Sequence, residues 1–278
     1  MTDSTIEPGA DPGTVPNRHV HPDPAPDRET AERRRRAVLA GHGGDAEAAR
    51  SLAVDPEAVV RAAALGALNR TGTLTDDGLA RGLTDPHPTV RLRALEILGG
   101  PTPLSGLLTR LLVDLLVDPI PEVVETACWA AGEHPEAADQ LVNSVVAVAG
   151  TGPEGDRPGH TDHLCREAAV AALGALGHEL GRESVLAGLG QRATIRRRAV
   201  LALAAFEGDD VEAALTRALD DRDWQVRQAA EALQISERKL WSMKASGEIP
   251  HVLLGRSVRY PRADLQQWID ERKTGGVR

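Results

Sequence analysis

The chain has 278 residues, of which 41% are apolar, 26% charged and only 2% aromatic, and its formal net charge is −9. So few large rings cannot fill the thick core of a β-sandwich or barrel, whereas abundant Ala and Leu suit thin layers of packed helices. No apolar run approaches the ~20 residues that span a bilayer, and the N-terminus lacks the apolar stretch of a signal peptide. Two cysteines cannot form a disulfide framework, which fits a reducing compartment. We therefore expect a mainly α-helical, cytoplasmic protein with no membrane partner.

Charge is divided unevenly along the chain. Residues 222–278 contain 11 Lys and Arg against 7 Asp and Glu, whereas residues 1–221 contain 21 against 34. An acidic body repels nucleic acid, whereas a basic segment tolerates it. This step in charge predicts two modules with different partners.

Residues 1–28 are expected to form a disordered tail, because they offer few large apolar side chains to bury. They also contain six prolines, at positions 8, 12, 16, 22, 24 and 26. His19 and His21 of this tail are predicted to be solvated, since a metal site needs several convergent ligands. A helix is predicted from Asp27 to Ala40. Its run Arg33–Arg36 is interpreted as a solvated face, with a nucleic-acid patch as the alternative.

The middle of the chain repeats itself. Each full copy has an Asp-Pro pair, then Val-Arg, then Ala and Leu at four and eight residues after the valine. The arginine position falls at residues 61, 91, 124, 166, 196 and 227, with spacings of 30, 33, 42, 30 and 31. Val124 replaces the arginine in the third copy. The long spacing contains an insertion from Thr151 to Thr161, rich in Gly and Pro, which we expect to be a surface loop.

Each copy is predicted to form two antiparallel helices. The Val, Ala and Leu spacing marks one helical face. We expect the Asp to end or cap an element and the Pro to occupy the first helical turn. A shorter Leu-rich helix should precede each copy, over the ranges Asp76–Leu83, Leu104–Leu116, Ala137–Val148 and Val211–Leu219. One such pair cannot bury its apolar stripe alone, so the pairs must stack.

The D-P-x-x-x-V-R-x-x-A-x-x-x-L pattern resembles HEAT repeats, especially the short kind noted in bilin-lyase-like proteins. The resemblance covers roughly residues 45–233, and we expect an α-solenoid of HEAT-like helix pairs over residues 29–233. It implies a scaffold that binds other macromolecules along a curved surface. Only some members attach bilins, and no residue here singles out that activity.

The repeated arginines allow two interpretations. In the first, they form a basic ladder that grips an acidic ligand. In the second, which we favour because Asp and Arg recur together, each pairs with the Asp of its own or the next repeat, although such pairs contribute little when exposed. The arginines concerned are Arg61, Arg91, Arg166, Arg196 and Arg227. The cluster Arg196–Arg198 is the expected exception.

The C-terminal segment follows a different pattern. The predicted order is helix, turn, helix, two short strands and helix. The expected ranges are Val226–Leu233, Gln234-Ile235, Ser236–Ser246, Pro250–Leu254, Ser257–Pro261 and Asp264–Lys273. Ser236 is a good N-cap, and Gly247 suits the left-handed position that ends a helix.

This segment resembles the excisionase and MerR-like winged helix-turn-helix domains, which carry a β-hairpin as the wing. The matching motifs are A-A-x-x-L-x-I-S at 229–236, S-G-E-I-P at 246–250, L-G-R at 254–256 and R-Y-P-R-A-D-L-x-x-W-I at 259–269. Gln234 departs from the glycine common in the turn. We expect this domain to span residues 222–273 and to share the helix 222–233 with the solenoid. Residues 274–278 would form a tail.

The resemblance implies double-stranded DNA as partner, with the helix from Ser236 in the major groove. Arg238 and Lys239 would approach the bases, while Ser242 and Lys244 would lie beside the backbone. The wing arginines would reach phosphates or the minor groove. The implied DNA-binding residues are Ser236, Arg238, Lys239, Ser242, Lys244, Arg256 and Arg259. The alternative treats these charges as solvated surface.

Catalytic patterns are weak. The chain has no phosphate-binding G-x-x-x-x-G-K-[ST] loop, no H-E-x-x-H and no paired C-x-x-C. A metal site at His160, His163, Cys165 and His178 is the less favoured interpretation, because Cys165 occupies the buried valine position of its repeat. Cys128 also falls on a repeat face. We nominate no catalytic residue, metal or cofactor.

The sequence therefore favours a non-enzymatic DNA-binding regulator or adaptor, whose solenoid binds an unidentified protein. A protein–protein scaffold without DNA binding is the alternative. A HEAT-type enzyme, such as a DNA glycosylase or bilin lyase, is the third, and the net charge of residues 1–221 disfavours the glycosylase. The oligomeric state is left open.

Overall fold

A computed structural model describes residues 26–101, 103–151 and 157–234, and in the last part of the chain residues 250, 252–254, 257–259, 264 and 267. The expected tail, with His19 and His21, lies almost wholly outside the described residues. Within them the chain is mainly helical, and no helix is long and apolar enough to cross a membrane.

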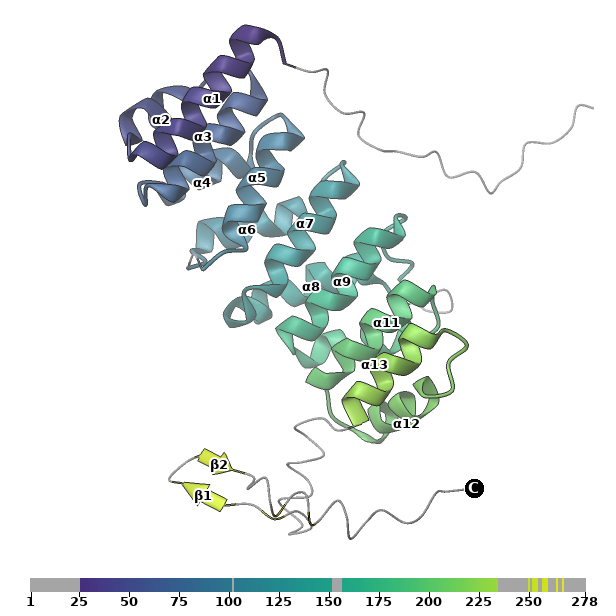
Figure 1. Cartoon of the computed structure of the whole chain (residues 1–278). Coiled ribbons are helices and arrows are strands. Elements are labelled where there is room, and N and C mark those ends of the chain that lie inside the picture. The colour runs from purple at the N-terminus through teal and green to yellow at the C-terminus, as the bar shows by residue number, and fades with distance from the viewer. Residues whose placement is uncertain are drawn as a thin grey trace, which may run out of the picture.

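The helices form two rows that run along one elongated stack (Figure 1). The first, which we call the odd row, contains α1 (Arg28–Gly43), α3 (Ala58–Arg70), α5 (Pro88–Leu98), α7 (Pro121–Gly132), α9 (His163–Leu176), α11 (Ala193–Ala202) and α13 (Trp224–Gln234). The even row contains α2 (Ala46–Leu52), α4 (Asp76–Leu83), α6 (Gly106–Leu115), α8 (Ala138–Ala149), α10 (Arg182–Gly188) and α12 (Asp209–Ala218). Short 3-10 turns lie at Pro135–Ala137, Glu179–Gly181 and Leu203–Ala205.

Each helix packs on its pair mate, and each odd-row helix also packs on its neighbours in the same row. Each odd-row helix contacts the next along the stack, and α2 through α12 each pack on the odd-row helix that follows. This arrangement is an α-solenoid of helix pairs, as the repeat pattern predicts. The helices predicted up to residue 233 agree with the observed ones to within a few residues, and Asp76–Leu83 agrees at both ends.

The repeated Val, Ala and Leu positions form the core. In α5, for example, Val90, Ala94 and Leu98 are all buried. One continuous apolar cluster runs from Leu65 in α3 to Ala214 in α12, so neighbouring pairs share a core and none has to bury its stripe alone.

Glycines let the odd-row helices approach closely. A Cβ atom at Gly174 of α9 would lie 2.6 Å from the Cα of Ala202 in α11, and one at Gly132 of α7 would lie 3.2 Å from the Cα of Ala172. The small side chains of Ala172 and Ala202 complete these contacts. Backbone therefore packs against backbone along the odd row.

The expectation that the Pro of each Asp-Pro pair occupies the first helical turn is wrong for the first three copies. Pro56, Pro86 and Pro119 lie before their helices, and the N-cap residues are Glu57, His87 and Ile120. Asp85 instead accepts a hydrogen bond from the backbone N–H of His87 at 2.9 Å. This is an Asx-type turn, and both carboxylate oxygens of Asp85 also accept hydrogen bonds from outside the repeat.

The insertion in the fourth copy is closed at its base by backbone hydrogen bonds. The N–H of Thr151 donates to the carbonyl of Arg157 at 2.9 Å, and that of His160 donates to the carbonyl of Val148 at 2.8 Å. The backbone at Gly150 lies against the backbone at Gly159, and both glycines have positive φ. A Cβ at Gly150 would lie 2.6 Å from the Gly159 nitrogen. Only residues without a side chain fit this crossing.

In the C-terminal segment, β1 (Val252–Leu254) pairs antiparallel with β2 (Ser257–Arg259), in the register Val252 to Arg259. Asp264 and Gln267 are helical, in the range where the last helix is expected. The expected helix Ser236–Ser246 lies outside the described residues.

Candidate functional site

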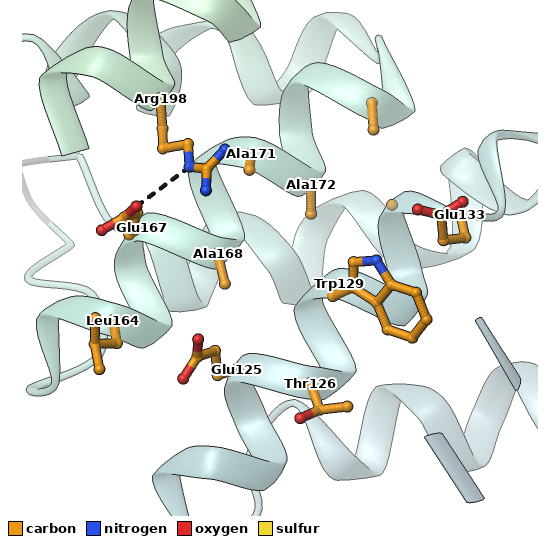
Figure 2. A pocket seen from close by; sticks show the side chains of 12 residues that line it. Glu125, Thr126, Trp129, Glu133, Leu164, Glu167, Ala168, Ala171, Ala172 and Arg198 are labelled. Carbon is orange, nitrogen blue, oxygen red and sulfur yellow. Dashed lines mark hydrogen bonds and ion pairs between the residues drawn. The ribbon is translucent and has the colours of Figure 1, made fainter. Parts of the chain in front are cut away.

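A groove of about 490 Å³ lies on the exposed face of the odd row, across α7, α9 and α11 (Figure 2). Its floor is made of small side chains from α9, namely Ala168, Ala171, Ala172 and Ala175. Alanines are good helix formers and fill little space, so the repeat leaves a hollow between neighbouring helices here.

Two large apolar side chains border this groove. Trp129 of α7 is 45% exposed and Leu164 of α9 is 46% exposed. The indole lies against Gly99 at the end of α5, where a Cβ would come within 2.5 Å of the ring. The glycine therefore makes room for the ring.

The polar rim of the groove is acidic. Glu125, Glu133 and Glu167 line it, and the only cation among the lining residues that the structure describes is Arg198, whose Nε lies 3.2 Å from Oε1 of Glu167. Burial raises the pKa of the Glu125 carboxyl, and the charges of Asp162, Glu167 and Glu122 raise it further. Negative charge at this rim is therefore incompletely balanced.

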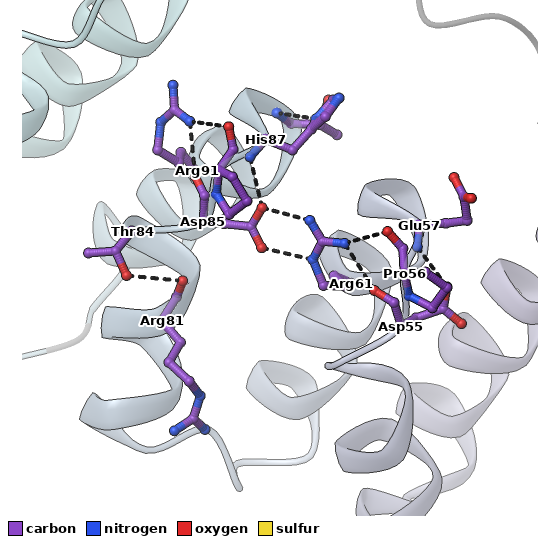
Figure 3. A network of polar contacts seen from close by, with 11 residues as sticks. Asp55, Pro56, Glu57, Arg61, Arg81, Thr84, Asp85, His87 and Arg91 are labelled. Atoms are coloured by element: carbon purple, nitrogen blue, oxygen red, sulfur yellow. Dashed lines mark hydrogen bonds and ion pairs between the residues drawn. The ribbon is translucent and has the colours of Figure 1, made fainter.

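The repeated arginines lie outside this groove, and Arg61 shows how most of them are paired (Figure 3). Arg61 donates from Nε and Nη2 to both carboxylate oxygens of Asp85 at 2.8 and 2.7 Å, and from Nη1 to the carbonyls of Asp55 and Pro56. One guanidinium thus joins the turn before its own helix to the Asp of the next repeat.

The same contact recurs along the stack and forms what we call the Arg–Asp ladder. Its closest N–O distances are 2.7 to 2.9 Å, in the pairs Arg33–Asp55, Arg61–Asp85, Arg91–Asp118 and Arg196–Asp221. The prediction that repeat arginines pair with aspartates is confirmed for Arg61, Arg91 and Arg196. The expectation that Arg196 is an exception is wrong, because Asp221 holds it in a bidentate pair.

The ladder breaks where one partner is missing. In the third copy Val124 stands at the arginine position, and in the fourth copy His160 stands at the Asp position with which that arginine would pair. Arg166 donates from Nη1 to the carbonyl of His160, but its buried Nε has no hydrogen-bond partner in the described structure, since Gly190 stands where the Asp would be. Arg227 donates to the carbonyl of Asp221.

The residues weighed as metal ligands make other contacts. Cys165 is buried and its Sγ donates to the carbonyl of Pro121 at 3.2 Å, while His178 contacts Asp139 through Nε2. The Nδ1 of His160 accepts from the N–H of Asp162. Across the described ranges, no group of three or more His, Cys, Asp or Glu side chains could hold a metal ion.

Both cysteines should resist thiol reagents in the folded protein. Burial raises the pKa of Cys128, and burial followed by nearby carboxylates raises the pKa of Cys165 to about 12. The reactive thiolate is therefore scarce at pH 8, whereas an ordinary cysteine has a pKa of about 8.5. We expect at least ~100-fold slower reaction with Ellman's reagent than in urea. Rapid reaction of one thiol per folded chain would contradict this.

Most of the implied DNA-binding residues lie outside the described part of the chain. These are Ser236, Arg238, Lys239, Ser242, Lys244 and Arg256. The backbone of Arg259 lies in β2, opposite Val252. Sequence reasoning also missed the groove on the odd row; the available signal was a lone Trp129 on a helix face whose neighbours are Glu125 and Glu133.

The chain was compared with protein families, curated proteins and solved structures. Residues 225–273 match the family model of the helix-turn-helix domain. Solved structures similar to the chain include a designed armadillo repeat protein in complex with the peptide (KR)4, at 16% identity and TM-score 0.49, covering 68% of this chain and 97% of that chain. A second designed armadillo repeat protein has 15% identity and TM-score 0.46, covering 67% and 97%. An engineered protein from a structural genomics consortium has 19% identity and TM-score 0.45, covering 77% and 99%.

The search of curated proteins found no match. The stacked helix pairs and the match at residues 225–273 lead to one description. In the part of the chain that the structure describes, stacked helix pairs precede the segment 225–273, which matches the helix-turn-helix domain.

Proposed function

We propose that the protein is a non-enzymatic DNA-binding regulator or adaptor, with the C-terminal domain on duplex DNA and the solenoid on a protein partner. The match of residues 225–273 to the helix-turn-helix domain carries this proposal. The excess of Lys and Arg in residues 222–278 supports it, since phosphate contacts supply most of the affinity for DNA.

In this proposal α13 belongs to both modules, and the DNA-binding domain spans residues 222–273. Val226 and Ala230 of α13 are buried in a cluster with Val200 of α11 and Ala218 of α12. The matched domain begins on the same helix, at residue 225. A shared helix would restrict the motion of the DNA-binding domain relative to the solenoid. The pair of β1 and β2 would serve as the wing.

Arg238 and Lys239 are proposed to read the bases, and Ser236, Ser242, Lys244, Arg256 and Arg259 to contact the backbone or groove edges. We expect Arg238→Ala with Lys239→Ala to weaken binding to a selected duplex about 100-fold, since each base contact contributes roughly 1–3 kcal/mol. The measurement is fluorescence anisotropy of the full chain with a duplex obtained by random-oligonucleotide selection, over a range of salt concentrations.

The matched control is Arg35→Ala with Arg36→Ala, which removes two exposed arginines of α1 and should leave DNA affinity unchanged. This control also tests the alternative nucleic-acid patch. Binding of the wild type should fall steeply with salt. Equal loss in both double variants would reject the assigned residues, and no selectable DNA binding would favour the scaffold without DNA contact.

A HEAT-type enzyme finds less support. A DNA glycosylase would need a basic, aromatic-lined surface for a flipped base, whereas residues 1–221 contain 34 acidic against 21 basic residues. The single tryptophan of that segment, Trp129, lies beside carboxylates.

A further inference from the structure

We propose that the groove across α7, α9 and α11 binds a basic segment of a partner protein, in which Lys and Arg residues flank one apolar side chain. This inference rests on the protein-binding half of the proposed function and names the chemistry of the partner. Three features of the groove support it: an apolar hollow, an exposed aromatic ring and an acidic rim.

The hollow suits an apolar side chain. Its floor is made of alanines of α9, and Trp129 and Leu164 stand at its border with nearly half of each side chain exposed. A volume of about 490 Å³ leaves room for a side chain and its backbone. Burying these exposed apolar surfaces would contribute roughly 25 cal/mol per Å² before the entropic loss of association is subtracted.

Trp129 can also receive a cation. The ring is held over Gly99, and a guanidinium or ammonium placed over an indole face is attracted to it. The aromatic ring and the carboxylates therefore favour the same class of partner.

The carboxylates select for positive charge. Glu125, Glu133 and Glu167 face one cation, Arg198, which is paired with Glu167. Glu122 and Asp162 lie close enough to oppose ionisation of Glu125, so the rim holds more negative charge than its own side chains neutralise. A bound Lys or Arg would relieve this repulsion, whereas DNA or an acidic segment would increase it.

The probe is a fluorescein-labelled twelve-residue peptide of alternating Lys and Arg with one central Leu. Two peptides of the same length serve as comparisons: one has Glu at every charged position, and one has Ser in place of Leu. With the full chain, we expect anisotropy to report binding of the first peptide, no binding of the acidic one, and several-fold weaker binding of the Ser peptide. Equal binding of all three would overturn the proposal, as would no binding of the first.

Variants locate the site. The groove triple combines Glu125→Gln, Glu133→Gln and Glu167→Gln. It should weaken binding of the basic peptide at least 10-fold and reduce the salt dependence of that binding. The matched control, Glu32→Gln with Glu47→Gln and Glu212→Gln, removes three exposed carboxylates from other surfaces and should bind as the wild type does. Trp129→Ala should weaken binding about 10-fold, and Trp129→Phe less. Equal effects of the two glutamine triples would overturn the proposal.

The same samples separate this inference from the DNA half of the proposed function. The groove triple should keep the DNA affinity of the wild type. A wild type that binds the peptide but no DNA would reject only the DNA half. Two further outcomes would overturn the inference. If the groove triple gains DNA affinity while the wild type does not bind the peptide, the chain's own basic segment occupies the groove. If the groove triple abolishes a dimer seen by sedimentation, a second copy of the chain occupies it.

Discussion

Arg91→Ala should lower the free energy of unfolding by about 3–5 kcal/mol. Only 10% of the Arg91 side chain and 6% of the Asp118 side chain are exposed, and the two form a bidentate pair at 2.8 and 2.9 Å. Removing the guanidinium leaves a buried carboxylate without its counter-ion. It also leaves the carbonyls of Asp85 and Pro86 without the Nη1 donor. Urea unfolding followed by far-UV circular dichroism measures the loss.

Two controls test whether the loss of stability comes from leaving a buried carboxylate without its counter-ion. Arg50→Ala breaks an exposed pair with Glu47 and should change stability by less than about 1 kcal/mol. Adding Asp118→Asn to Arg91→Ala should recover part of the lost stability, because a neutral amide is cheaper to leave buried and its oxygen can still accept from the N–H of Ile120. A double variant less stable than Arg91→Ala alone would contradict the unpaired-charge explanation.

Gly174→Val should destabilise the solenoid by about 3 kcal/mol. The added Cβ would lie 2.5 Å from the Cβ and 2.6 Å from the Cα of Ala202, so helices α9 and α11 would have to separate. The neighbouring atom is backbone and cannot rotate away. Because α9 and α11 belong to the continuous core, separating them also exposes Leu173 and Leu203. Thermal unfolding of the variant and the wild type checks this.

The control for this prediction is Gly106→Val at the start of α6, where a Cβ would meet nothing within 4 Å. Its stability should stay within about 0.5 kcal/mol of the wild type. If Gly174→Val were equally harmless, the close approach of the odd-row helices would not be a determinant of stability.

The helix pairs were predictable because their signal is local. Val90, Ala94 and Leu98 fall on one face at helical spacing, and the same apolar spacing recurs in the other repeats. That Arg61 pairs with a repeat aspartate also followed from recurrence, whereas the structure decided that this is the aspartate of the next repeat. The exact role of Asp85 did not follow from recurrence, since an Asx turn and an N-cap use the same residue types and differ only in backbone geometry.

The groove was not predictable in the same way. Trp129, Leu164 and Arg198 come from three different repeats, at positions that no shared spacing marks. Whether such residues meet depends on how closely α7, α9 and α11 pack and on the space that Gly99 leaves for the ring.

The amino-acid order alone determined that this protein is a stack of helix pairs with a separate basic segment, because helix periodicity, repeat length and charge are properties of neighbouring residues. Tertiary structure alone decided which charges remain available. Packing places the ladder arginines against aspartates that neutralise them, whereas it gathers Glu125, Glu133 and Glu167 near the exposed Trp129 with Arg198 as the one cation among the described lining residues.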